Sequence, residues 1–311
     1  MSIVVLNHLA SELRDNIHQL EQLVHQADHT YRWLFLSNQY NFDQTMPFLV
    51  LYYHQSHLVG VGTIYAEDTD LAEVTSVIHP QYRMLPIKDA MIAKIKQICR
   101  DYRIRAIGYK IERNFYQQYP AFFNRYRLNP DAMPELILQF GDNQKEFLGK
   151  EVQTVVAVRK QKNKRYDSQF DEKEDSVVQV SRALPQDLNS IAHILAECFD
   201  DSYYEERLFV ERVAADSSMV LYQFSIQNEI IGTCSIEVHP KVIYLFAVAI
   251  KKKQQNKGFG TKAIAQLTTY LTQKYRRPLQ IQADKDNKKA IKLYQKLGFK
   301  TVSEWIELIE K

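Results

Sequence analysis

The chain has 311 residues, of which 45% are hydrophobic and 25% are charged, and its formal net charge is +3. This length favours two domains, and this composition excludes a wholly disordered chain. The small net charge gives no overall electrostatic reason to expect a nucleic-acid or membrane partner.

The cysteines and the N-terminus indicate the compartment. The three cysteines are odd in number and far apart, with neither paired zinc-ligand spacing nor a disulfide framework. The N-terminal segment MSIVVLNHLASELRDN has only a short apolar run, and no stretch reaches the roughly 18 apolar residues that span a bilayer. We therefore expect a cytoplasmic protein with no membrane span, no targeting signal and no metal ion.

A charged segment divides the chain into two domains. Residues 159–175, RKQKNKRYDSQFDEKED, form a basic block followed by a mostly acidic one, without apolar periodicity. This pattern is typical of a linker or an exposed loop. Its basic half could contact a polyanion, although a solvated segment is the commoner explanation of a charge run. We expect domains at residues 1–158 and 176–311.

The second domain begins with a mixed α/β pattern. Residues 177–184 alternate like a strand, and residues 185–199 have the apolar spacing of a helix. Two strand-like runs, 219–227 and 229–238, meet at a tight polar turn, which predicts an antiparallel hairpin. The almost wholly apolar run 241–250 is typical of a central strand.

The same alternation continues to the end of the chain. A helix is expected from about Gly258 to Tyr275, and a strand at residues 279–284. A short amphipathic helix at residues 287–297 is ended by Gly298, and a last strand follows it.

The first domain repeats this plan in outline. Part of it can be laid over the hairpin, central strand and helix of the second domain, with equivalent residues 172 positions apart. Gly60 falls on Gly232, Ile78 on Ile250, Arg83 on Gln255 and Lys88 on Gly260. An internal repeat of domain size is the simplest explanation, and coincidence between two α/β patterns is the alternative.

The stretch QNKGFG, residues 255–260, lies between the expected central strand and its helix. Unpaired amides at a helix N-terminus bind anions, and glycines let phosphate oxygens approach them. The stretch lacks the Gly-Lys-Ser/Thr order of a Walker loop. Its distance from the strand and the antiparallel strands before it argue against a dinucleotide-binding fingerprint.

QNKGFG resembles the Q/R-x-x-G-x-G/A loop of the GNAT superfamily of N-acetyltransferases, which holds the pyrophosphate of acetyl-CoA. Residues 287–299, NKKAIKLYQKLGF, are similar to that family's N-x-x-A-x-x-L-Y-x-K-x-G-F segment. The resemblance is strong over residues 176–311 and covers residues 1–140 only in outline. It implies an α/β (α+β) fold with two acyl-CoA N-acyltransferase (GNAT) type domains, each a mixed, mostly antiparallel sheet flanked by helices.

The resemblance also implies acetyl-CoA as co-substrate. The end of the central strand would pair its backbone with the pantetheine arm, the loop would hold the pyrophosphate, and Asn287 would bond the arm. The residues concerned are Val248, Ala249 and Ile250 on the strand, and Gln255, Asn256, Lys257, Gly258, Phe259, Gly260 and Thr261 in the loop and helix start.

Two catalytic residues are candidates on the same resemblance. In this family the acceptor amine attacks the thioester directly, so Tyr294 would protonate the leaving thiolate and a backbone amide near Val248 would stabilise the oxyanion. Some members carry a glutamate base at the position of Tyr244. Here Glu237 is the candidate base, with His239 behind it, and both are equally well explained as residues of a surface turn. On pattern alone Tyr294 fits a core position, just as Asn287 fits a helix N-cap.

The implied function is transfer of an acetyl group from acetyl-CoA to a primary amine of a small-molecule or peptide acceptor. The acidic and aromatic segment DDSYYEERLF, residues 200–209, lies where the family places acceptor-binding helices, and a solvated helix face explains it as well. The alternative function is a non-catalytic module that binds CoA, protein or RNA.

The first domain is expected to be degenerate. Pro86 and Lys88 stand at the positions of the two loop glycines, and proline has no N–H to donate. Phe123 stands at the position of Tyr294 and cannot donate a proton, and Arg127 replaces the glycine that follows. We expect this domain to shape the acceptor site or the domain interface without acetyl-CoA chemistry.

Overall fold

The structure is a computed structural model that describes residues 2–141 and 177–311. The expected linker at residues 159–175 lies outside the described residues. The chain forms two compact units. Unit 1 consists of Met1–Ile137, Asp284–Asp286 and Val302–Lys311, and unit 2 consists of Leu138–Ala283 and Asn287–Thr301.

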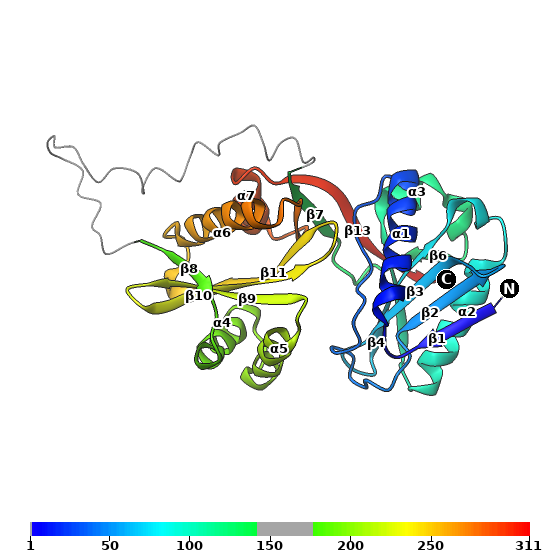
Figure 1. The fold of residues 1–311 in the computed structure, drawn as a ribbon, viewed down its shortest axis with the longest axis horizontal. Helices are drawn as coiled ribbons and strands as arrows, with labels where there is room; N and C mark the ends of the chain where they lie inside the picture. The colour runs from blue at the N-terminus through cyan, green and yellow to red at the C-terminus, as the bar shows by residue number, and fades with distance from the viewer. Residues whose placement is uncertain (1, 142–176) are drawn as a thin grey trace, which may run out of the picture. The chain divides into compact units, whose positions relative to one another are not determined.

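Unit 1 is a mixed sheet with helices on both faces (Figure 1). The order of its strands is β1-β2-β3-β4-β5-β13, and β6 also pairs with β13. Its strands pair antiparallel except β4 and β5, which are parallel. Its elements are β1 (Ser2–Leu6), α1 (Ser11–Asp28), β2 (Leu49–His54), β3 (His57–Tyr65), β4 (Leu71–Ile78), η1 (Pro80–Tyr82), α2 (Ile87–Asp101), β5 (Ala106–Glu112), α3 (Arg113–Gln118), η2 (Pro120–Phe123), β6 (Tyr126–Leu128) and the end of β13 (Lys300–Glu310).

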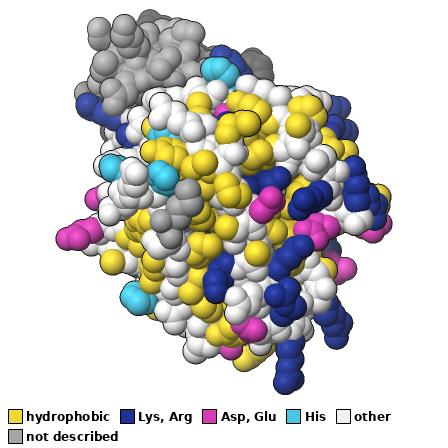
Figure 2. Space-filling view, turned by 90° about the vertical axis from the view of Figure 1, so that its right-hand side faces the viewer, with side chains coloured by type: hydrophobic (Ala, Val, Ile, Leu, Met, Phe, Trp, Pro, Cys, Tyr) yellow, Lys and Arg dark blue, Asp and Glu magenta, His cyan; other side chains and the backbone are white. Residues whose placement is uncertain are grey.

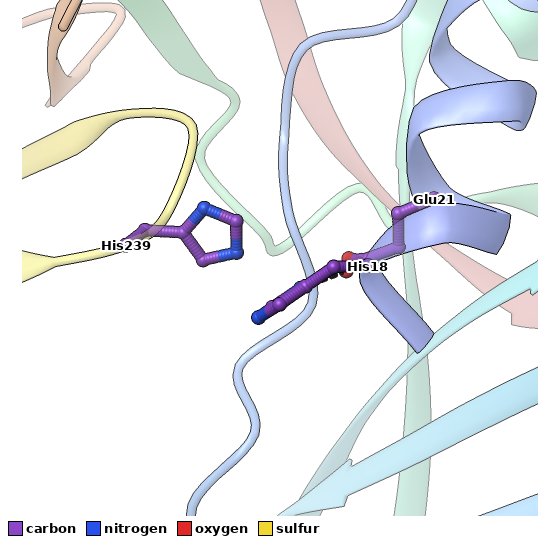
Figure 3. Close-up of side chains that lie close together, drawn as sticks. All are labelled: His18, Glu21 and His239. Atoms are coloured by element: carbon purple, nitrogen blue, oxygen red, sulfur yellow. Dashed lines mark hydrogen bonds and ion pairs between the residues drawn. The ribbon is translucent and has the colours of Figure 1, made fainter. Parts of the chain in front are cut away.

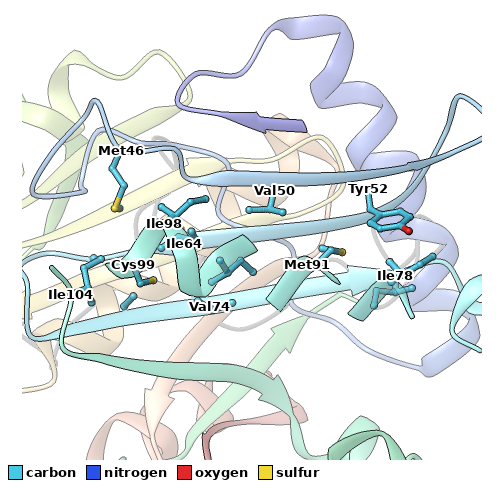
Figure 4. Packing of buried hydrophobic residues seen from close by; sticks show 14 of the residues in the cluster. Met46, Val50, Tyr52, Ile64, Val74, Ile78, Met91, Ile98, Cys99 and Ile104 are labelled. Carbon is cyan, nitrogen blue, oxygen red and sulfur yellow. The ribbon is translucent and has the colours of Figure 1, made fainter. Parts of the chain in front are cut away.

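Alternating side chains of the unit 1 strands form two hydrophobic clusters. Leu49 and Leu51 of β2 pack with Ile17 of α1, whereas Val50 packs with Met91 of α2 (Figure 4). Successive residues of a strand point to opposite faces of the sheet, so α1 and α2 cover opposite faces. Because both faces are buried, the strands of this unit read as apolar runs.

A buried carboxylate connects α1 to the segment that follows it. Glu21 Oε2 lies 2.9 Å from Nδ1 of His18, one turn earlier on α1 (Figure 3). Its other oxygen accepts a hydrogen bond of 2.5 Å from the amide of Leu34. Burial raises the pKa of Glu21 above the ordinary value of a carboxyl group. His239, which Figure 3 also draws, belongs to unit 2.

Unit 2 repeats the mixed sheet, in the strand order β7-β12-β11-β10-β9-β8. Helices α4 and α5 cover one face, and α6 and α7 cover the other (Figure 1). Every helix and strand expected in the second half of the chain is present. The elements are β7 (Glu135–Phe140), β8 (Gln179–Arg182), η5 (Pro185–Asp187), α4 (Leu188–Phe199), α5 (Tyr203–Ala215), β9 (Met219–Ile226), β10 (Glu229–Val238), β11 (Ile243–Ile250), η6 (Lys252–Gln254), α6 (Phe259–Tyr275), β12 (Leu279–Asp284) and α7 (Lys288–Lys296).

The two units confirm the predicted internal repeat. The hairpin β2–β3 turns through Gln55 and Ser56, and the hairpin β9–β10 turns through Gln227 and Asn228, all with positive φ. Such left-handed pairs form the two-residue turns that favour hairpins. These turn residues are again 172 positions apart, so the offset between the two sequences is also an offset between equivalent structural positions.

The C-terminal strand belongs mainly to unit 1, and not to the second domain as expected. The second domain was expected to run to residue 311, but Val302–Lys311 belongs to unit 1. There β13 pairs with β5, with Leu308 opposite Tyr109, and its buried Ile306 packs with Tyr126. The first unit is therefore completed by the last residues of the chain.

The surface and the helices give two further results. On the face shown in Figure 2, acidic side chains lie among the Lys and Arg side chains, so the charge there is mixed. Among the described residues, no helix combines the length and the apolar character needed to cross a bilayer.

Candidate active site

The central strand of unit 2, β11, contains a bulge. Thr233 of β10 pairs with Ala249, and Ser235 pairs with Phe246. Two residues of β11, Ala247 and Val248, therefore stand opposite one residue of β10. Ala247 has a φ of 48°, in the left-handed region. A bulge redirects backbone groups, and this one lies at Val248, the expected oxyanion position.

One edge of β11 is open beyond the bulge. Its parallel pairing with β12 covers Ile243 to Leu245, and residues 246–250 have no partner strand on that side within the described residues. The amide of Lys251 donates to Ile231 of β10 over 2.8 Å. Because pairing groups alternate along a strand, Ile250 directs its own N–H and C=O toward the open edge. An extended ligand can add to such an edge as a further strand.

The carbonyl of Ile250 is held by two side chains. Gln255 Nε2 donates to it over 2.9 Å, and the thiol of Cys198, at the end of α4, donates over 3.2 Å. Burial raises the pKa of Cys198, so the thiol keeps its proton. The carbonyl is therefore satisfied by the protein, and the amide N–H of Ile250 is the group that a ligand arm would meet.

The loop before α6 leaves a row of amides unpaired. Asn256 and Gly258 have left-handed backbones, with φ of 61° and 81°. The amide of Lys262 donates to Gly258 over 3.1 Å, but the amides of residues 256–261 donate to no protein acceptor in the described parts of the chain. A Cβ at Gly258 would meet nothing within 4 Å. These amides and the helix dipole can bind an anion.

The lysines around this loop are mostly engaged with neighbours or exposed. Lys251 forms an ion pair of 2.9 Å with Glu229, and Lys253 lies 3.7 Å from the same carboxylate. Lys257 donates to Gln254 over 3.0 Å. The backbone, more than these side chains, defines the candidate phosphate site.

The equivalent loop of unit 1 lacks this cradle. Pro86, at the position of Gly258, precedes α2 and has no N–H. The amide of Ile87 donates to Leu85 over 2.8 Å, and that of Leu85 donates to Tyr82 over 3.1 Å. Of the unit 1 positions equivalent to residues 256–261, three therefore have no free amide N–H, because it is absent or already bonded.

The central strand of unit 1 also lacks the bulge. The β3–β4 pairs run without a shift from Gly60 opposite Ile78 to Tyr65 opposite Glu73. No residue of β4 has positive φ. Unit 1 therefore lacks both the strand bulge and the row of free amides that distinguish the β11 site. This agrees with the expectation that the first domain is degenerate.

Tyr294 of α7 lies near Cys234, the β10 residue at the bulge. Its side chain is 6% exposed, and burial, with a smaller effect of the nearby Cys234, raises the pKa of its hydroxyl group. Cys234 is the β10 residue that stands opposite Ala247 and Val248. The hydroxyl group therefore keeps its proton at neutral pH, close to the expected reaction centre.

Asn287 caps the N-terminus of α7. Its side-chain oxygen accepts a hydrogen bond of 3.1 Å from the amide of Ala290. Gly298, with a φ of 93°, follows the helix in a conformation that favours glycine. The cap accounts for one polar atom of Asn287, and its side-chain amide is exposed at the surface.

Glu237 lies at the other end of the bulged strand pair. It stands opposite Tyr244, and directly opposite residues of an antiparallel pair project to the same face. Tyr244 and Val248 are four residues apart, or about 13 Å in an extended strand. A proton path between Glu237 and the bulge would therefore need bridging water. His239, in the following turn, accepts hydrogen bonds from Arg277 to its carbonyl over 2.7 Å and from the Lys241 amide to its ring over 3.2 Å.

The acidic and aromatic segment at residues 200–209 forms the start of α5. Glu205 and Ser202 form reciprocal hydrogen bonds as a capping box. Helix capping therefore explains why one of the acidic residues, Glu205, is present. Tyr203 stacks on His193 with ring centroids 4.2 Å apart. Tyr204 is 70% exposed and has no such role.

Two features of this site were not foreseen from the sequence. The bulge at Ala247 has no glycine or proline to mark it. Cys198 ended a predicted helical stripe and was assigned no contact, although it lies beside the carbonyl of Ile250.

Comparison with known proteins supports this geometry. Residues 188–299 match the model of the acetyltransferase (GNAT) family. No curated protein matches the sequence. Three solved structures share the fold over nearly the whole chain at low identity.

A tandem GNAT protein from the clavulanic acid biosynthesis pathway is 14% identical, with a TM-score of 0.64 over 99% of this chain and 98% of its own. A GCN5-related N-acetyltransferase from Sphaerobacter thermophilus is 11% identical, with a TM-score of 0.62 over 99% and 95%. An acetyltransferase of the GNAT family from Colwellia psychrerythraea is 11% identical, with a TM-score of 0.59 over 100% of both chains. The C-terminal half of this chain therefore carries an acetyltransferase (GNAT) family domain, within a chain that has the fold of tandem GNAT proteins.

Proposed function

We propose that unit 2 transfers an acetyl group from acetyl-CoA to a primary amine by direct attack. The proposal rests on one observation, which is that an open strand edge runs directly into a loop with free amides. The open edge of β11 leads into a loop whose amides at residues 256–261 have no protein acceptor. An extended amide-containing arm fits the edge, and a diphosphate at its end fits the amides.

The cofactor contacts follow from this placement. The N–H groups of Ile250 and Val248 would bond the pantetheine arm and the thioester, with Ala249 between them directed toward β10. Gln255 would fix the loop through its bond to Ile250, and Asn287 would bond the arm from the start of α7. The pyrophosphate would lie on the amides of Asn256, Lys257, Gly258, Phe259, Gly260 and Thr261.

The chemistry requires one oxyanion site and two proton transfers. The amine nitrogen attacks the thioester carbon, and the amide at Val248 stabilises the oxyanion that forms. When the intermediate collapses, the C–S bond breaks and Tyr294 donates its proton to the thiolate. The proton of the attacking amine leaves through water toward Glu237. The acceptor is a small-molecule or peptide amine that approaches from the side of residues 200–209.

The test is acetyl-CoA turnover by the full chain, followed by thiol release, with a mixed amine library and products identified by mass. The same experiment compares CoA binding by the natural chain with CoA binding by the variant Gly260→Asp. Aspartate in the first turn favours the helix, while its charge and bulk oppose a diphosphate. We expect a loss of CoA affinity of at least tenfold by calorimetry, with the thermal midpoint retained.

Asn189→Asp is the matched control, because it adds the same charge to the first turn of α4. It should leave CoA affinity unchanged. If Gly260→Asp binds CoA as the natural chain does, the phosphate site is misplaced. If the natural chain binds CoA but consumes no acetyl-CoA with any amine, the alternative of a non-catalytic CoA-binding module is correct.

A further inference from the structure

Unit 1 contains a cavity of about 100 Å³ between the diverging ends of β4 and β5. The two strands pair only from Leu71 to Val74 of β4. Beyond that point, residues 75–78 and 110–112 line the cavity. A single water needs roughly 10–15 Å³ of such space, so the cavity has room for a small organic molecule.

The cavity has mainly aromatic and aliphatic walls. Aromatic side chains come from β5, from the α3–η2 segment, from β6 and from the C-terminal strand. They are Tyr109, Phe115, Phe122, Phe123, Tyr126 and Trp305. Preformed apolar cavities with a few polar groups are typical of small-molecule sites, and aromatic walls favour an aromatic occupant.

Two cations of the lining, Arg83 and Lys110, are already paired with carboxylates. Arg83 forms a two-pronged ion pair with Asp28, in which Nη1 donates to Oδ1 over 2.8 Å and Nη2 donates to Oδ2. Lys110 lies 3.0 Å from Glu73, 3.4 Å from Glu307 and 3.9 Å from Glu135, so acidic groups outnumber its positive charge. Neither Arg83 nor Lys110 therefore offers a free positive charge to an anionic ligand.

Lys88 is different, because it has no ion-pair partner within the described residues. Its ammonium donates to the carbonyl of Phe122 over 2.5 Å and lies 4.3 Å from the centre of that ring. It is also in the first turn of α2, where the helix dipole adds positive potential. Burial lowers the pKa of Lys88, which indicates that its charge is under-compensated.

Two further titratable side chains, Glu112 and His25, complete the lining. Glu112 Oε1 accepts hydrogen bonds from the amides of Tyr31 and Arg32. Burial raises the pKa of Glu112, and burial lowers the pKa of His25 to about 4. Burial thus disfavours the negative charge of Glu112, and a neutral imidazole does not repel an anion.

We propose that this cavity binds a small monocarboxylate with an aromatic body, whose carboxylate lies on Lys88 and whose ring lies among the aromatic side chains. The ligand is not acyl-CoA, because the loop of unit 1 lacks the free amides that a diphosphate needs. Unit 1 is then a binding domain in its own right, and its site does not depend on acetyl transfer by unit 2.

The tryptophans allow this site to be tested in the full chain. Both tryptophans, Trp33 and Trp305, lie in unit 1, and Trp305 lines the cavity. Titration with phenylacetate and 3-phenylpropionate should give a saturable change in tryptophan fluorescence. Phenylacetamide and phenethylamine, which lack the negative charge, should bind at least tenfold more weakly.

Two variants locate the ligand. Lys88→Met keeps the aliphatic stem and removes the charge, so it should abolish the preference for the carboxylate. Lys94→Gln, on the same helix but outside the cavity lining, should preserve it. Ile92→Phe fills the cavity and should abolish binding of all the probes.

Three results would overturn the proposal. They are no saturable binding by the natural chain, equal affinity for phenylacetate and phenylacetamide, and full binding by Ile92→Phe. The charge series on the natural chain decides the question even if a variant fails to fold. If CoA competes with phenylacetate and abolishes the fluorescence change, the probe binds at an acyl-CoA site and the proposal is wrong.

Discussion

The side chain of Arg83 donates from Nε to the carbonyl of Ile78 over 3.3 Å. Gln255 makes the equivalent bond to Ile250 in the other unit, 172 positions later. Arg83 then continues to Asp28, which is 1% exposed. The same loop position therefore steadies the loop with free amides in unit 2, our proposed phosphate site, and forms a structural ion pair in unit 1.

Loss of this ion pair should destabilise unit 1. Asp28→Asn leaves a largely buried guanidinium without its counter-charge, and breaking a buried pair in this way costs about 3 to 5 kcal/mol. We expect urea unfolding, followed by tryptophan fluorescence, to show a loss of about 3 kcal/mol. The double variant Asp28→Asn/Arg83→Met should recover part of it, and a single-variant loss below about 1 kcal/mol would show that water compensates the charge.

Tyr294→Phe separates catalysis from packing. The ring fills the same buried space without a proton to donate, so CoA affinity and thermal stability should be retained. We expect the rate of acetyl transfer to fall by roughly 100-fold, the lower end of the range for general acid catalysis. Phe299→Leu, which changes a ring 6.0 Å away, is the packing control. Unchanged turnover in Tyr294→Phe would reduce Tyr294 to a core residue.

Glu237→Gln tests the base. If water carries the amine proton to this carboxylate, the variant should lower kcat/KM by about 10-fold or more at neutral pH and leave CoA affinity unchanged. The loss should shrink at high pH, where more of the acceptor is already a free amine. A constant ratio between the two enzymes across pH would exclude Glu237 as the base.

The order and type of elements in the second half could be predicted because each one carries its own local signal. Apolar periodicity marks α6, the polar turn at Asn228 marks a hairpin, and Gly298 marks the end of α7. Phosphate binding by loop residues 255–260 stays a prediction, which their glycines and their place before a helix make specific.

The remaining features depend on contacts that sequence patterns do not encode. A strand edge offers the same backbone groups wherever it pairs, so the pattern of β13 cannot tell which sheet it joins. The bulge at Ala247 arises because β11 has one more residue than β10 between paired positions. Since no glycine occurs there, the sequence of β11 does not indicate the bulge. The cavity next to Lys88 depends on side chains from eight separate elements that meet only in the folded unit.

His25 should make unit 1 sensitive to acid. Burial lowers the pKa of its imidazole to about 4 in the folded unit, against about 6.5 in an unfolded chain. The unfolded chain therefore binds the proton first as the pH falls. The stabilising contribution is fully present above pH 6.5 and is lost between pH 6.5 and 4, by about 3 kcal/mol in total.

The comparison of His25→Phe with the natural chain isolates this effect. Buried Glu21 and Glu112, whose pKa values are raised, act in the opposite direction in both proteins and cancel in the difference. The ring of His25 lies 4.6 Å from that of Trp33, so tryptophan fluorescence reports unfolding locally. We expect urea midpoints of the natural chain to fall relative to His25→Phe between pH 7 and pH 5. Parallel midpoints over this range would mean that the imidazole takes up its proton within the folded unit.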